Sequence, residues 1–109
     1  MITTHVLDTA LGRPAQGIAI ELERFDATWH LLGAGITDAD GRLKTLTPAG
    51  PVTPATYRIR FQTGPYFESL AQKGFFPVVE IQFTIEDGAA HYHVPLLLSP
   101  YAYSTYRGS

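Results

Sequence analysis

The sequence predicts an all-β sandwich, and three features of its composition and patterning lead to that prediction. Isoleucine, valine and threonine make up 24 of the 109 residues and aromatic side chains 13 more, and both groups favour pleated, half-buried strands. Hydrophobic residues recur at every second position in several short runs, and clusters rich in glycine, proline and aspartate separate those runs. Short alternating strands divided by turns are typical of antiparallel sandwiches and barrels.

Five runs alternate as expected of strands with one buried face. Their hydrophobic positions, in chain order, are Ile2 and Val6; Ile18, Ile20 and Leu22; Tyr57, Ile59 and Phe61; Val79, Ile81, Phe83 and Ile85; and Tyr92, Val94, Leu96 and Leu98. Turn signals lie between them at residues 11–14, 38–41, 48–54 and 86–88. We interpret Asp38-Ala39-Asp40-Gly41 as a hairpin turn rather than a calcium loop, because the later acidic ligands of such a loop are missing.

One segment departs from this period of two. Phe67, Leu70 and Ala71 lie at helical spacing, and Lys73 and Gly74 supply signals for a helix C-terminus. We therefore predict a short helix over residues 66–74, closed by Gly74. No linker, repeat or low-complexity tract divides the chain, so residues 1–109 are predicted to form a single domain.

The charge balance and residue inventory narrow the range of functions. Eight Lys and Arg against ten Asp and Glu leave a formal net charge of −2 without a basic cluster, which argues against binding to nucleic acid or an anionic membrane. The chain has no cysteine and therefore no disulfide or thiolate site. The apolar run 94–98 is too short to span a bilayer, and the first residues lack a signal-peptide pattern. We expect a cytoplasmic location, or a periplasmic one if a leader has been removed.

Two strands carry unusual residues on the face that should meet water. With Ile2, Val6 and the even-numbered positions of 92–98 in the core, the outward side chains are His5, Leu7, His91, His93, Pro95 and Leu97. An outward stripe of leucine, proline and histidine favours a subunit interface with a polar site set into it. A register slip of one residue would exchange the two faces and remove this inference.

Histidine dominates the chemistry that the sequence offers. Patterns for a serine-hydrolase elbow, a P-loop or a dinucleotide-binding turn are missing. His91 and His93 would share one strand face, a spacing that suits zinc if His5 converges as a third ligand. No carboxylate accompanies the pair, so the residues by themselves leave both a zinc site and metal-free histidine chemistry open.

Three blocks of the sequence resemble the transthyretin-like family. Thr4-His5-Val6-Leu7-Asp8 with Gly12-Arg13-Pro14-Ala15 is similar to the first strand and turn of that family, and residues 91–105 are similar to its last two strands. The final Tyr106-Arg107-Gly108-Ser109 resembles the tail that separates 5-hydroxyisourate hydrolases from the hormone-carrying transthyretins. The resemblance covers essentially the whole chain.

The resemblance implies a transthyretin-like sandwich of two four-stranded sheets with one short helix. It implies a homotetramer, a dimer of dimers, with active sites at the dimer–dimer interface. The implied reaction is hydrolysis of 5-hydroxyisourate to 2-oxo-4-hydroxy-4-carboxy-5-ureidoimidazoline by attack of water on a lactam carbonyl. Neither a metal nor an organic cofactor is implied.

The resemblance also implies roles for individual residues. The expected catalytic residues are His5, Arg42, His93 and Ser109, and the expected substrate-binding residues are Tyr106, Arg107, Gly108, Leu97 and Ser104. Histidine suits proton transfer near neutral pH, and arginine presents a planar, permanently charged fork to carbonyl oxygens. Which histidine deprotonates water stays open, as does whether Arg107 touches substrate or braces the tail by ion pairing. Ser109 is expected to orient a histidine or the substrate.

Two other functions remain as alternatives. The chain could be a non-catalytic carrier that binds a planar aromatic ligand in the tetramer channel, or a zinc-dependent hydrolase that uses His5, His91 and His93.

Two further sets of charged residues are predicted to form solvated surfaces without a role in the site; they are Arg58 and Arg60, and Glu21 and Glu23.

Overall fold

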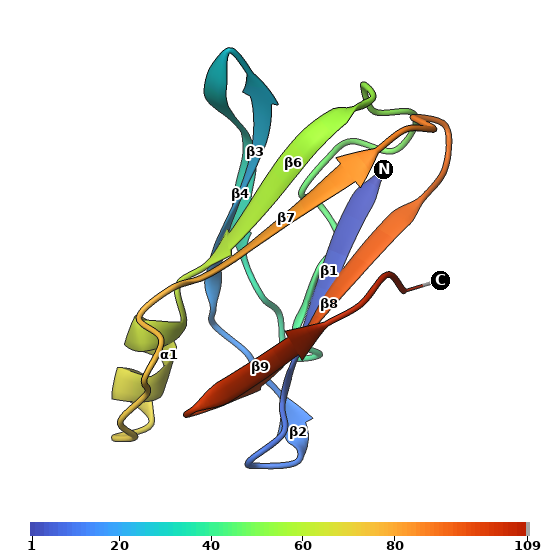
Figure 1. The fold of residues 1–109 in the computed structure, drawn as a ribbon. Helices are drawn as coiled ribbons and strands as arrows, with labels where there is room; N and C mark the ends of the chain where they lie inside the picture. Colours follow the sequence, from blue (N-terminus) through green and yellow to red (C-terminus); the bar gives the residue numbers. More distant parts are fainter. Residues whose placement is uncertain (109) are drawn as a thin grey trace.

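The computed structural model describes residues 1–108, which form two stacked β-sheets and one short helix (Figure 1). The elements in chain order are β1 (Ile2–Asp8), β2 (Arg13–Pro14), β3 (Ala19–Asp26), β4 (Thr28–Ile36), β5 (Arg42–Leu43), β6 (Ala55–Phe61), α1 (Thr63–Ser69), β7 (Val79–Ile85), β8 (Tyr92–Ser99) and β9 (Ala102–Thr105). The transthyretin-like sandwich predicted from the sequence is confirmed.

The first sheet has the strand order β2-β1-β8-β9, and β5 also pairs with β1. Because β8 occupies one whole edge of β1, the two-residue strands β2 and β5 follow each other along the other edge. The first sheet therefore contains five strands but is four strands wide. The second sheet has the order β4-β3-β6-β7.

The hydrophobic core lies between the sheets and is built from the alternating positions predicted from the sequence. Ile59 and Phe61 of β6 and Leu96 and Leu98 of β8 are completely buried. Removing such side chains from water is the main favourable contribution to folding, at about 1.5–3 kcal/mol for each fully buried large apolar side chain. The period of two in the sequence therefore reports directly which face of each strand meets the core.

The helix differs from the predicted one at both ends. It spans Thr63–Ser69 instead of residues 66–74. Its C-terminal end comes earlier than predicted because Ala71, rather than Gly74, adopts the left-handed backbone that follows the helix, with φ of +53°. Gly74 serves close packing instead, since an added Cβ there would lie 2.5 Å from Cδ2 of Phe67. Within residues 1–108, no helix has the length and hydropathy required to cross a bilayer.

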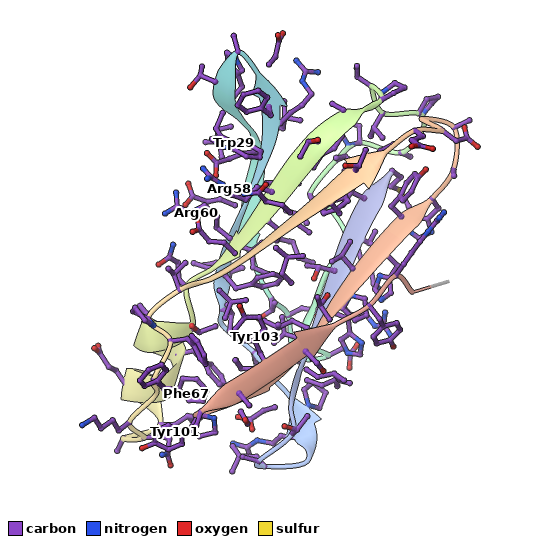
Figure 2. All side chains as sticks on the ribbon, viewed as in Figure 1. Trp29, Arg58, Arg60, Phe67, Tyr101 and Tyr103 are labelled. Carbon is purple, nitrogen blue, oxygen red and sulfur yellow. The ribbon has the colours of Figure 1, made fainter. Side chains whose placement is uncertain are left out.

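On the outer face of the second sheet, the structure also differs from the predicted solvated surface. Arg58 and Glu23, predicted to be solvated, face each other across β6 and β3, and Nη2 of Arg58 lies 2.9 Å from Oε1 of Glu23. Nε of Arg60 lies 3.0 Å from Oε2 of Glu80 on β7. The guanidinium of Arg58 stacks over the ring of Trp29 at 4.2 Å (Figure 2). Sequence alternation predicts the face but not these cross-strand partners, which depend on register.

Candidate active site

Three strands of the first sheet bring His5, Arg42 and His93 to its outward face. His5 of β1 is paired directly with Arg42 of β5, and Thr3, two residues before His5, lies beside His93 of β8. Residues two apart on a strand share a face, and paired residues on neighbouring strands point to the same side. Residues far apart in the sequence therefore form one cluster, and the predicted outward orientation of His5 and His93 is confirmed.

A tight turn immediately before β5 positions Arg42. Oδ1 of Asp38 accepts the N–H groups of Asp40 and Arg42 at 2.9 and 3.0 Å. The backbone hydrogen bond from Arg42 lowers the pKa of Asp38. Gly41 has a φ of +73°, and an added Cβ would lie 2.3 Å from the carbonyl oxygen of Val6, so only glycine fits. The turn joins β4 of the second sheet to β5 of the first, so it is not the hairpin that we predicted.

The ring of His5 is oriented by the same turn. Its Nε2 lies 2.8 Å from the carbonyl oxygen of Asp40. A carbonyl oxygen can only accept a hydrogen bond, so Nε2 carries the proton. In the neutral ring Nδ1 therefore has the free lone pair, and it is the nitrogen that can accept a proton.

His93 is held by Thr3 and surrounded by positive charge. Its Nδ1 lies 2.9 Å from Oγ1 of Thr3. Burial lowers the pKa of His93, and positive charge on Arg42, His5 and His91 lowers it further. The lowered pKa favours the neutral ring near pH 7, which is the form that can take a proton from water.

The C-terminal tail runs back along β8 and reaches His93. The N–H of Gly108 donates to the carbonyl oxygen of His93 at 2.7 Å, forming an isolated antiparallel bridge. Ser104 of β9 is paired with Leu97 of β8, so the two expected substrate-binding residues are neighbours. Tyr106 is 58% exposed. Ser109, expected to be catalytic, lies outside the described residues.

The structure does not bring Arg107 together with His5 and His93. Its guanidinium lies 4.6 Å from the centroid of the Tyr92 ring, and Tyr92 belongs to the core-facing side of β8. A cation over an aromatic face in this way gains about 0.5–2 kcal/mol. The contact of Arg107 with substrate therefore stays a prediction.

The outward face is hollowed next to His93. The hollow has a volume of about 280 Å³ and is lined by Met1, Thr3, Thr4, Arg42, Lys44, His91 and His93. Sequence reasoning missed Lys44 and Thr3, and it considered His91 as an outward residue and a possible zinc ligand. Alternation offered a signal for Lys44, because Leu43 is buried and its two neighbours, Arg42 and Lys44, share the other face. Two cationic side chains make the hollow suited to an oxygen-rich, electron-rich ligand.

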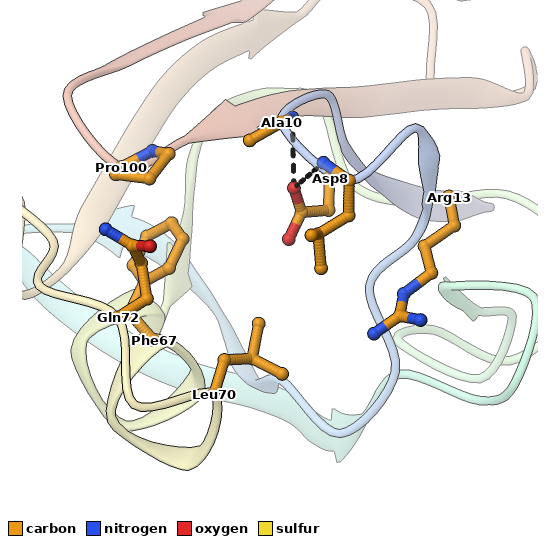
Figure 3. Close-up of a pocket in the computed structure, with 8 residues that line it drawn as sticks. Asp8, Ala10, Arg13, Phe67, Leu70, Gln72 and Pro100 are labelled. Atoms are coloured by element: carbon orange, nitrogen blue, oxygen red, sulfur yellow. Dashed lines mark hydrogen bonds between the residues drawn. The ribbon is translucent and has the colours of Figure 1, made fainter.

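A second cavity of about 290 Å³ lies near the other end of β1, beside α1 (Figure 3). Its lining includes Asp8, Arg13, Phe67 and Leu70 and none of the predicted site residues. The Asp8 carboxylate is 2% exposed and already accepts hydrogen bonds from the N–H groups of Ala10 and Leu11 and from the Tyr66 hydroxyl. These three hydrogen bonds occupy the carboxylate of Asp8, so it does not supply this cavity with a free acid or base.

The described histidines do not converge as a zinc site. Across residues 1–108, His, Cys, Asp and Glu side chains form no group of three or more placed to hold a metal ion. The ring centroids of His91 and His93 are 6.5 Å apart, and the ring of His5 is turned toward the carbonyl of Asp40. Within residues 1–108 the three histidines therefore do not form the zinc site that the sequence left open.

The fold is a transthyretin-type sandwich whose first sheet carries two histidines and an arginine on its outward face. A model of the HIUase/Transthyretin family matches residues 2–108. The chain belongs to that family, as the sequence resemblance predicted.

Curated relatives and solved structures agree on this family. The 5-hydroxyisourate hydrolase of Salmonella typhimurium is 48% identical over 110 residues, covering 100% of this chain and 81% of the relative. The 5-hydroxyisourate hydrolase of Mus musculus is 46% identical over 111 residues, covering 99% and 94%. The structure of Klebsiella pneumoniae 5-hydroxyisourate hydrolase superposes with a TM-score of 0.87 at 34% identity, covering 99% of this chain and 98% of the other.

Similarity of fold does not separate enzyme from carrier. Sea bream transthyretin in complex with thyroxine superposes with a TM-score of 0.92 at 30% identity, covering 98% of this chain and 93% of the other. A hormone-bound protein and a hydrolase thus share this backbone. The function therefore has to be argued from the side chains of the site and not from the fold.

Proposed function

We propose that this protein hydrolyses 5-hydroxyisourate to 2-oxo-4-hydroxy-4-carboxy-5-ureidoimidazoline. The observation that supports this most strongly is the cluster of His5, Arg42 and His93 on three adjacent strands, beside a hollow of about 280 Å³. Hydrolysis of a lactam needs a base for water, a stabiliser for the oxyanion and a proton for the departing nitrogen. The cluster contains a group for each requirement.

We assign the base to His93. Its lowered pKa keeps the ring neutral near pH 7, and its Nδ1 is engaged by Thr3. Nε2 of His93 is then the atom that takes a proton from water as the water oxygen bonds to the lactam carbon. General base catalysis of this kind contributes about 10²–10⁴-fold to a rate.

We assign the oxyanion to Arg42 and the leaving-group proton to His5. The Arg42 side chain is half-buried and held next to His5 by the β1–β5 pairing, and its guanidinium can donate to the carbonyl oxygen as negative charge develops there. The protonated ring of His5 can give its Nδ1 proton to the ring nitrogen as the C–N bond breaks, while its Nε2–H stays engaged by Asp40. The proton that His93 takes from water is released to solvent, and His5 regains its proton from solvent. No step in this assignment passes through a metal or an organic cofactor.

The remaining predicted residues complete the proposed pocket. Leu97, Ser104, Tyr106 and Gly108 line the substrate side. Arg107 contacts the substrate or braces the tail by ion pairing, and Ser109 orients a histidine or the substrate. We further propose a homotetramer, a dimer of dimers, that buries the outward face of the first sheet and encloses the sites at the dimer–dimer interface. Native mass spectrometry at micromolar concentration tests the assembly: a tetramer supports it and a monomer contradicts it.

A coupled assay tests the activity. Urate oxidase generates 5-hydroxyisourate, and its absorbance decay is followed with and without this protein. Decay faster than the spontaneous rate, lost in His93→Ala and unaffected by a chelator, is the expected result. His30→Ala is the matched control, because His30 is exposed on β4 of the other sheet.

The alternative is a carrier for a planar aromatic ligand, favoured by the structural similarity to thyroxine-bound sea bream transthyretin. A folded tetramer that does not accelerate the decay but binds such a ligand by calorimetry would overturn the hydrolase proposal. The polar histidine–arginine cluster argues against this outcome, because an apolar ligand would have to desolvate it.

A further inference from the structure

Thr3 lies between two histidine rings. Its Oγ1 is 2.9 Å from Nε2 of His91 and 2.9 Å from Nδ1 of His93. A hydroxyl group has a single proton, so Thr3 can donate to only one of the two rings. If both rings donated to Thr3, its proton would have no acceptor within residues 1–108, and Thr3 is only 8% exposed. The arrangement that pairs all three groups within residues 1–108 has one ring donating to Thr3 and the other accepting from it.

This arrangement links the protons of the two rings. When His91 accepts the Thr3 proton at Nε2, Nδ1 of His93 donates to Thr3, and Nε2 of neutral His93 keeps its lone pair. When Nε2 of His91 carries a proton, it donates to Thr3, which in turn donates to Nδ1 of His93. Neutral His93 then carries its proton on Nε2 and cannot accept one there.

We propose that Thr3 and His91 are positioning residues that select the tautomer of His93, and hence decide whether its Nε2 can act as a base. The proposal deepens the proposed function, since it rests on His93 as the base of the same reaction. His91 itself touches no reacting atom and acts through the Thr3 hydroxyl. Neutral His91 allows the productive tautomer, and protonated His91 removes it.

Other charged groups face His93, and their effects differ from that of His91. Arg42 and His5 come from the neighbouring strands β5 and β1, while Lys44 and Met1 line the same hollow. The Met1 amino group donates to the carbonyl oxygen of Gly50 at 2.8 Å. These groups act on His93 through charge. His91 acts in addition through a directional hydrogen-bond chain, which a tautomer-sensitive measurement can separate from charge.

Nitrogen-15 NMR of the imidazole rings in the intact protein tests the tautomer directly. At neutral pH we expect a protonated Nδ1 and an unprotonated Nε2 for His93. In Thr3→Val, which removes the hydroxyl and keeps the branched shape, we expect both tautomers, whereas Thr3→Ser restores the single one. This readout does not depend on catalysis, so it separates failure of this proposal from failure of the proposed function.

Kinetics supply the second readout. Loss of one hydrogen bond in Thr3→Val should lower kcat by about three- to tenfold with KM unchanged. In His91→Gln the amide oxygen still accepts the Thr3 proton, so activity and the Nδ1-protonated tautomer of His93 are kept at neutral pH. In His91→Leu that acceptor is missing, so Thr3 donates to Nδ1 of His93 and kcat falls as in Thr3→Val. Thr28→Val, an exposed threonine of β4, is the matched control.

Two results would overturn the proposal. One is a wild-type His93 that carries its proton on Nε2 at neutral pH, and the other is a His91→Leu variant that keeps the wild-type kcat and the wild-type tautomer of His93. If Thr3→Val fails to fold, the wild-type spectrum and the comparison of His91→Leu with His91→Gln still decide the question.

Discussion

Gly108 is hydrogen-bonded to the backbone of His93 and leaves no room for a side chain of its own beside the His93 ring. The Gly108 N–H donates to the carbonyl oxygen of His93 at 2.7 Å, and a Cβ added to Gly108 would lie 2.7 Å from Cδ2 of the His93 ring. Non-bonded carbon atoms prefer about 3.5–4.0 Å, so either the ring or the tail would have to move. The C-terminal tail thus limits where the His93 ring can lie.

Gly108→Ala is therefore expected to lower kcat by about ten- to hundredfold, because a displacement of about 1 Å in a catalytic group has effects of that order. The free energy of unfolding should change by less than about 0.5 kcal/mol, since the contact lies outside the core. Steady-state kinetics and urea denaturation check the two parts. An unchanged kcat would show that the tail does not constrain the ring.

Arg42→Lys separates charge from shape. Lysine keeps the positive charge but loses the planar fork, so we expect kcat/KM to fall by about tenfold to several hundredfold. The measurement is the decay of 5-hydroxyisourate at substrate concentrations well below KM. Arg13→Lys is the control, because Arg13 is exposed and lines cavities beside α1 rather than the hollow next to His93. Equal activity of Arg42→Lys and the wild type would reduce the role of Arg42 to a point charge.

The titration of His93 gives a pH prediction of defined sign. Burial, and after it the positive charge of Arg42, lowers the pKa of His93 from its ordinary value of 6.5. The neutral ring is therefore favoured by folding, so its contribution to stability is full above about pH 6.5 and is lost as pH falls through the lower, folded-state pKa. NMR titration should place that pKa below 6.5.

Arg42→Gln provides the matched test of this cause. Removing the guanidinium charge should raise the pKa of His93 toward 6.5, while burial continues to hold it down. The same NMR titration, followed on the His93 ring proton, measures the change. A pKa that stays unchanged in this variant would show that Arg42 does not contribute, and would leave the shift to burial and the charges of His5 and His91.

Tyr66→Phe tests a contact that supports the fold rather than the site. The Tyr66 hydroxyl of α1 donates to Oδ2 of buried Asp8 at 2.8 Å, and burial together with this bond raises the pKa of Tyr66. Removing the hydroxyl leaves a buried carboxylate oxygen without its donor, so we expect a loss of about 1–3 kcal/mol in the free energy of unfolding. Urea denaturation measures it, with Tyr101→Phe at an exposed position as the control. Hydrolysis should persist in both variants.

Local pattern was sufficient for the faces of the strands. The alternation around Val6 and Leu96 predicted that His5 and His93 point outward, because a strand turns its side chains to opposite sides at every residue. The family resemblance added Arg42, which no local pattern singled out. The helix boundaries were predicted less well, because the left-handed residue after α1 is Ala71, a residue type that gives no termination signal.

The sequence by itself determined the class of fold, the buried faces, the family and the residue types available for catalysis. Only the tertiary structure decided which of those residues meet. The parallel pairing of β1 with β8 sets Thr3 beside His93, and the pairing of β1 with β5 sets His5 beside Arg42. Strand register between segments about 40 to 90 residues apart is set by packing and turn geometry. The proton chain from His91 through Thr3 to His93 is therefore a property of the folded sheet.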